Sequence, residues 1–220
     1  MDMASLSPRL LAVLLVAWAV ALPATASAGG WDIDPQSGKF PLQFTVAAGV
    51  TSWTTESTLF ECTSLTGSGR YETATTGSIE LTLHGCASIS PSLTCTSSGQ
   101  PKGTITTNEM QFHNIFLEPE KGKPGFLITA KEGRFASFAC NGIAMELSGN
   151  GLIAEMTAPK CGEAGKTLTQ LYEASSLGHQ KWMQAETAGT KYDLSWTLGG
   201  TAAFQTTSTL TLAEQATVTC

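Results

Sequence analysis

The histidines and serines are the first side chains to test for catalytic chemistry. The chain holds three histidines, His84, His113 and His179. A histidine placed between a serine and a carboxylate activates that serine as the nucleophile of a hydrolase. Gly67-Ser68-Gly69 is too short to be the G-x-S-x-G nucleophile turn. An extracellular hydrolase therefore stays an alternative, and no catalytic residue is assigned to it.

Two pairs of neighbouring carboxylates could serve a glycosidase or bind calcium. Glu118 and Glu120 lie in an expected loop, and Asp32 and Asp34 lie near the start of the expected mature chain. A glycosidase needs two carboxylates across a cleft, and calcium needs several further oxygen ligands. The sequence offers neither pair such neighbours. We interpret all four as solvated charges and predict no catalytic residue, no metal site and no cofactor.

The glycine-rich segments do not predict a nucleotide-binding loop. Such a loop requires G-x-x-x-x-G-K-[ST] at the start of a helix, whereas Arg70, Tyr71 and a run of threonines follow Gly69. Gly165-Lys166-Thr167 has the right ending but lacks the first glycine. Glycines in these places indicate turns and bulges.

The cysteines indicate disulfides rather than zinc ligands. An even number in an exported chain is typical of a disulfide framework, whereas zinc sites need closely spaced pairs or nearby histidines. The candidates are Cys62, Cys86, Cys95, Cys140, Cys161 and Cys220. Sequence alone does not select their connectivity.

A weak internal repeat favours one set of disulfides. Phe60-Glu61-Cys62 and Phe138-Ala139-Cys140 each precede a glycine turn, an apolar strand and a further cysteine. Strands that fold back at these turns would bring each cysteine level with the next. The favoured set is Cys62–Cys86, Cys140–Cys161 and Cys95–Cys220, and the competing set contains Cys86–Cys95 and Cys62–Cys220.

The N-terminus predicts a secretory signal peptide over residues 1–28. A short basic start leads into the apolar run 10–22, and Ala26 and Ala28 form an A-x-A cleavage site. The run is shorter than the roughly 20 residues that span a bilayer. We expect one mature domain over 29–220, secreted to the extracellular space or the cell envelope, with no transmembrane segment.

The charge of the chain excludes one class of partner. The formal net charge is −6, and the lysines are scattered. Nucleic-acid binding needs clustered lysine and arginine side chains, so we predict no nucleic-acid partner. An envelope glycan or another protein remains as the class of partner, and the sequence does not identify it.

Alternation of apolar and polar residues with a period of two indicates β-strands. Ile79, Leu81 and Leu83 share one face, and similar segments lie at 42–46, 192–198 and 209–212. Turn residues separate these runs, and no segment keeps a convincing helical period over three turns. The fold class predicted is all-β, an antiparallel β-sandwich of hairpins with disulfides, and a closed β-barrel is the alternative.

One segment fits two kinds of structure. Residues 166–176 are the best helix candidate in the chain. Leu168, Gln170 and Tyr172 nevertheless alternate within it, which fits a strand equally well.

Aromatic side chains offer two ways to bind a ligand. Trp182 lies in a polar stretch and is the best candidate for surface binding through stacking on a sugar ring, although core packing is favoured for it. Trp196 is in step with an apolar run and is expected in the core. A carrier barrel would instead have a cavity lined by residues such as Phe112, Phe116 and Trp196.

The segments 62–69, 76–86 and 95–105 together resemble a paralogous group of uncharacterised exported all-β proteins of soil actinobacteria. The likeness extends over most of the mature chain, including 138–140 and 178–180. It implies an exported all-β protein and implies no activity. The residues 31–35 are similar to the first strand of YceI-type lipid-binding barrels.

These observations together predict a secreted, disulfide-bonded, non-catalytic protein with a binding or structural role in the cell envelope or extracellular space. The alternatives are a β-barrel carrier of an apolar ligand and an extracellular hydrolase.

Overall fold

The all-β expectation is confirmed. The computed structural model describes residues 30–176, 178–183, 191–196 and 200–220, so the expected signal peptide lies outside the described residues. Among them, the only helical elements are the short 3-10 turns η1 (Pro119–Lys121) and η2 (Lys131–Gly133). No helix in this part of the chain is long and apolar enough to cross a membrane.

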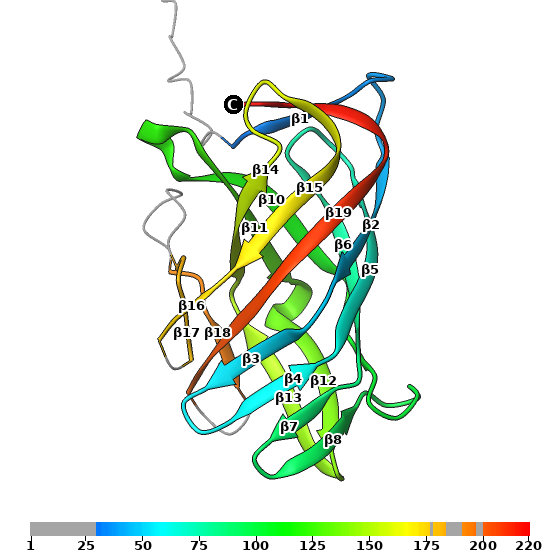
Figure 1. Ribbon diagram of the computed structural model, residues 1–220, viewed down its shortest axis with the longest axis vertical. Helices are drawn as coiled ribbons and strands as arrows, with labels where there is room; N and C mark the ends of the chain where they lie inside the picture. The colour runs from blue at the N-terminus through cyan, green and yellow to red at the C-terminus, as the bar shows by residue number, and fades with distance from the viewer. Residues whose placement is uncertain (1–29, 177, 184–190, 197–199) are drawn as a thin grey trace, which may run out of the picture.

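Eight strands close into an antiparallel barrel, the alternative architecture that the sequence allowed (Figure 1). Around the barrel they follow one another in chain order as β2 (Leu42–Ala48), β5 (Ser64–Tyr71), β6 (Thr76–His84), β10 (Met110–Glu118), β11 (Lys123–Ala130), β14 (Leu152–Ala158), β15 (Ala164–Tyr172) and β19 (Thr201–Thr219). The last strand returns to the first, with Leu210 opposite Val46. We call this closed structure the first barrel.

The long connections of the first barrel form a second closed ring of strands. Successive connections of an antiparallel barrel alternate between its two ends, and here one end has short turns while the other carries all the insertions. The second ring contains β3 (Thr51–Thr55), β4 (Leu59–Cys62), β7 (Ala87–Ile89), β8 (Ser92–Thr96), β12 (Arg134–Cys140), β13 (Ile143–Gly149), β18 (Leu194–Trp196) and the beginning of β19. It occupies the lower part of Figure 1.

Strand β19 belongs to both closed structures. Its residues Ala202–Gln205 pair with β3 of the second ring, and Ser208–Leu212 pair with β2 of the first barrel. We call the level of Thr206, between these two ladders, the waist. One long strand therefore ties the two rings into a single body with a continuous core.

The remaining short strands decorate the two rings. They are β1 (Asp32–Pro35), which pairs with the end of β19, β9 (Ile105–Thr106), which pairs with β6, and the two-stranded sheet of β16 (Ala174–Ser176) and β17 (His179–Gln180). Beside β1, the buried Trp31 donates a hydrogen bond from its indole N–H to the Gly125 carbonyl at 2.7 Å. This contact fixes the beginning of the described chain to β11.

Aromatic rings fill the interior of the first barrel. Phe112 stacks on Phe126 with ring centroids 4.6 Å apart, and it contacts Tyr71 edge-on at 4.8 Å. Gly77 on β6 makes room for this packing, because a Cβ there would collide with the Phe112 ring. The predicted inward face of Ile79, Leu81 and Leu83 is buried as expected.

The ambiguous segment 166–176 is extended rather than helical. Most of it belongs to β15, where Leu168, Gln170 and Tyr172 all point into the barrel and are buried. Within the described part of the expected segment 192–198, the strand is β18, and the side chain of Trp196 lies outside the described residues.

All six cysteines form disulfides, but only part of the predicted connectivity is right. The bonds are Cys62–Cys86, Cys95–Cys140 and Cys161–Cys220. The predicted Cys62–Cys86 bond is confirmed. The other predicted bonds, Cys140–Cys161 and Cys95–Cys220, are wrong, and so are the competing pairs Cys86–Cys95 and Cys62–Cys220.

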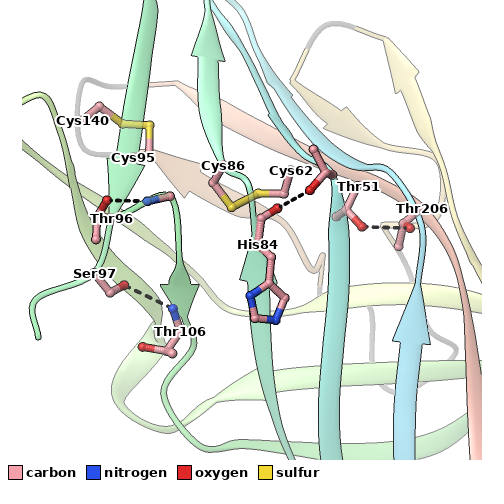
Figure 2. The surroundings of a disulfide bond; sticks show 12 residues. Thr51, Cys62, His84, Cys86, Cys95, Thr96, Ser97, Thr106, Cys140 and Thr206 are labelled. Carbon is pink, nitrogen blue, oxygen red and sulfur yellow. Dashed lines mark hydrogen bonds between the residues drawn. A yellow bond between two sulfur atoms is a disulfide. The ribbon is translucent and has the colours of Figure 1, made fainter. Parts of the chain in front are cut away.

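The position of the β7–β8 hairpin explains the observed pairs. This hairpin lies between β4 and β12, so Cys86 meets Cys62 on one side and Cys95 meets Cys140 on the other (Figure 2). Cys161 lies in the β14–β15 connection, at the end of the first barrel that faces away from the second ring. It is therefore out of reach of Cys140.

Candidate functional site

The three histidines lie in three separate environments. The ring of His84 points outward from β6 with its Nε2 3.1 Å from Thr66 Oγ1, below the Cys62–Cys86 bond in Figure 2. His113 is exposed on β10. His179 Nδ1 lies 3.5 Å from Asp193 Oδ2. Among the described side chains, His179 is therefore the histidine that lies beside a carboxylate.

The His179–Asp193 pair does not complete a hydrolase site in the described chain. Desolvation by burial raises the pKa of Asp193, although its hydrogen bonds with Leu194 N–H and His179 act in the opposite direction. The His179 ring also approaches Thr201 Oγ1 at 3.5 Å, through the same Nδ1 atom. Among the described side chains, the imidazole has no serine partner that could act as a nucleophile.

The acidic pairs from the sequence are surface charges. Lys121 donates to Glu118 and holds the pKa of that carboxyl below its ordinary value, so Glu118 is unsuited to act as a general acid. Asp32 and Asp34 are exposed on the outer face of β1. Within the described residues, no group of three or more His, Cys, Asp or Glu side chains could hold a metal ion.

Trp182 lies on the outer wall of the first barrel. It packs, half-buried, against a small apolar cluster formed by Ile115, Leu117, Leu127 and Ile153. Lys123 Nζ lies 4.7 Å from the centre of its ring, and Lys181 Nζ lies at 5.9 Å. These contacts give the indole a packing role, and its use as a stacking platform stays a prediction.

The barrel interior is filled. Phe112, expected to line a cavity if the protein were a carrier, is fully buried among other rings. The void found between the first barrel and the second ring has about 10 Å³, which is room for about one water molecule. An apolar ligand of ordinary size has no chamber there.

The outer wall carries the best candidate site, a groove of about 440 Å³ across β6 and β10. We call it the outer groove. Charged and hydrogen-bonding side chains line it, and Lys131 of η2 contributes to its wall. Its lining residues include Arg70, Glu72, Ser78, Glu109, Gln111, His113 and Lys131. A hollow of about 170 Å³ continues it toward β2 and shares Arg70, Ser78 and Glu109 with it.

The register of the barrel builds this groove. Gln43, Arg70, Ser78 and Gln111 are direct neighbours across β2, β5, β6 and β10. All four side chains point outward, because the next residue on each strand points inward. These inward residues are Phe44, Tyr71, Ile79 and Phe112. The short Ser78 between two long neighbours makes the floor of the groove.

The charges at the outer groove are mixed rather than purely acidic or basic. Arg70 forms an ion pair with Glu72, and both side chains are about half exposed. Glu109 directly precedes β10, where Met110 pairs with Ile79, and Glu80 follows Ile79 on β6. The register therefore brings these two carboxylates to the same side of the groove. Amides, hydroxyls, carboxylates and a guanidinium are thus available within one groove.

Sequence reasoning did not select the residues of the outer groove. Arg70, Ser78 and Gln111 occupy solvent-facing positions of strands, which is an ordinary place for a polar residue. Only the strand register, which joins distant parts of the chain, brings them together. His113, one of the three possible bases in the sequence, does line the groove, but none of its described neighbours is a recorded hydrogen-bond or ion-pair partner that would prepare it for catalysis.

No protein-family model, no curated protein and no solved structure matches this chain.

Proposed function

We propose that this protein is a secreted, non-catalytic binding protein whose outer groove holds a polar glycan of the cell envelope. The observation that carries the proposal is the row of outward Gln43, Arg70, Ser78 and Gln111 on a rigid, closed barrel wall. Planar amide and guanidinium groups beside hydroxyls and carboxylates can donate to and accept from the many hydroxyls of a sugar chain.

Export of the chain is part of this proposal. Three disulfides support it, because such bonds persist in oxidising compartments outside the cytoplasm. The segment 1–28 would direct export and be removed, leaving the domain that begins at Gly29.

The two alternatives receive less support from the described residues. A carrier of an apolar ligand needs an internal chamber, and the interior is packed with aromatic rings. A serine hydrolase needs a serine hydroxyl next to its base, whereas the hydroxyl beside the His179 ring is that of Thr201, and it approaches the same Nδ1 atom that faces Asp193.

Titration with soluble envelope polysaccharide fragments tests the proposal. We expect chemical-shift changes at Arg70, Ser78 and Gln111 in NMR spectra. Gln111→Ala and Arg70→Ala should each weaken binding about tenfold, which corresponds to the loss of one hydrogen bond to a charged or polar group. Lys102→Ala is the matched control, because Lys102 lines a separate hollow beside β8 and β12.

The outcomes separate the candidate functions. Binding that Lys102→Ala removes and Gln111→Ala spares would place the ligand outside the outer groove. Release of new reducing ends from the polysaccharide would show a hydrolase. The absence of any shift with the fragments would overturn the glycan proposal.

A further inference from the structure

The waist of the molecule contains a buried amide with one unused end. Gln170 on β15 is 1% exposed. Its Oε1 accepts hydrogen bonds from Tyr172 OH at 3.0 Å and from Ser208 Oγ at 3.3 Å. Its Nε2 has no partner. Buried polar atoms are nearly always satisfied by protein or by ordered water, so this atom requires an explanation.

Gln170 also borders a void. Gln170, Thr206 and Ser208 line the void of about 10 Å³ described above, together with apolar side chains from β2, β5, β6 and β14. No charged residue is among its lining residues. The chemistry of the lining therefore fits a neutral, hydrogen-bonding occupant rather than an ion.

Turning the amide round does not remove the problem. If its oxygen and nitrogen exchanged places, Nε2 could donate to the two hydroxyls, but Oε1 would then be left without a donor. Both hydroxyls lie at one end of the amide, so its other end lacks a protein partner in either orientation.

We propose that the waist is a binding site for one buried water molecule. The void has about the volume of one water molecule, and such waters typically bridge otherwise unsatisfied polar groups. The water accepts from Gln170 Nε2 and donates to the oxygens of Thr206 and Ser208.

Thr206 connects this site to the second ring. Its hydroxyl donates to the Val50 carbonyl at 3.3 Å and accepts from Thr51 Oγ1 at 3.1 Å, the contact drawn in Figure 2. The proposed water thus extends a buried polar network from β15 of the first barrel to β3 of the second ring.

A high-resolution crystal structure of the full mature chain tests this proposal. We expect one density peak within hydrogen-bond distance of the Gln170 amide. Gln170→Met keeps the side-chain length but removes the amide, so the peak should disappear. Thr51→Val is the control, because Thr51 is buried nearby but does not line the void, and its crystals should keep the peak.

Xenon gives a test that does not depend on the variants. A crystal of the wild-type protein under xenon pressure should keep water in the void, because apolar voids take up xenon and hydrated polar ones do not. Xenon in the void, an empty void in the wild-type map, or an unchanged water peak in Gln170→Met would each overturn the proposal.

Discussion

The first barrel and the second ring are both closed, but they are held closed in different ways. Several neighbouring strands of the first barrel pair over long ladders, such as Leu42–Ala48 of β2 against Leu65–Tyr71 of β5. In the second ring, β4 meets β7, and β8 meets β12, through two residue pairs each. A disulfide lies at each of these two weak junctions.

This difference shows two solutions to the problem of a sheet edge. An open edge exposes unpaired backbone groups, and closure removes it. Hydrogen-bonded ladders achieve closure in the first barrel. Covalent bonds supplement the short ladders in the second ring, where Cys62, Cys86, Cys95 and Cys140 are all buried. The exposed Cys161–Cys220 bond instead joins a turn to the end of β19.

Removal of both disulfides of the second ring should have the largest effect on stability, and it should affect the second ring more than the first barrel. Replacing Cys62, Cys86, Cys95 and Cys140 by serine removes two cross-links, which join residues separated by 24 and 45 positions in the sequence. The loop entropy predicts a loss of about 7 kcal/mol in the free energy of unfolding. We expect hydrogen exchange to accelerate first in β7, β8 and β12, while β5 and β6 stay protected.

The Cys161→Ser/Cys220→Ser variant is the control for this experiment. Its sequence separation of 59 is the largest of the three, so loop entropy alone assigns it the largest single effect, about 4 kcal/mol. Its loss should leave exchange in the second ring unchanged. Equal acceleration in both variants would show that loop length, and not ladder length, determines which strands depend on a disulfide.

Phe112→Ala should have the next largest effect, and it should act on both closed structures. The ring is fully buried in the first barrel, and its loss should cost about 4 kcal/mol in the free energy of unfolding. Because β19 and the core are shared, the second ring should melt together with the first barrel in calorimetry. Val50→Ala, at a side chain 62% exposed, should change stability by less than about 0.5 kcal/mol.

A second ring that melts separately in Phe112→Ala would contradict this expectation. It would mean that the disulfides make that ring independent of the first barrel.

The smallest expected effect is the change of the free energy of unfolding with pH in the acidic range. Two carboxyl groups, Asp193 and Glu118, should contribute to it with opposite signs. Burial raises the pKa of Asp193, beside β18 of the second ring, above its ordinary value of 3.8. Its contribution to stability is therefore complete below that value and is lost as pH rises through the raised pKa. Glu118 of the first barrel has the opposite sign, because Lys121 lowers its pKa and the contribution is lost as pH falls.

Urea unfolding across the acidic pH range measures both contributions. Asp193→Asn should remove the decline with rising pH, and Glu118→Gln should remove the decline with falling pH. Identical pH profiles for Asp193→Asn and the wild type would contradict the assignment for Asp193.

The sequence predicted local structure better than it predicted pairing. The alternation of Ile79, Leu81 and Leu83 is sufficient to identify a strand and its buried face. Closure of the barrel depends on β19 meeting β2 across most of the chain, and no local pattern encodes that contact. The predicted partners of Cys95 and Cys140 were wrong for the same reason, because their bond depends on where the β7–β8 hairpin lies.

The candidate sites differ in the signal that the sequence carries for them. If the segment 166–176 is taken as a strand, the alternation of Leu168, Gln170 and Tyr172 places a glutamine on its buried face, which signals a polar site in the core. The outer groove has no such signal, because Arg70, Ser78 and Gln111 look like ordinary solvent-facing residues until the register aligns them.

Because β19 belongs to both the first barrel and the second ring, it determines when each of them can close during synthesis. Residues 201–219 follow every other strand of both rings in the chain, so neither ring can close until they have been synthesised. A nascent or translocating chain releases its N-terminal part first. The earlier strands therefore remain without ring closure, and their cysteines stay accessible to oxidation, until β19 has been synthesised. Pairing of β19 then closes the first barrel and the second ring together.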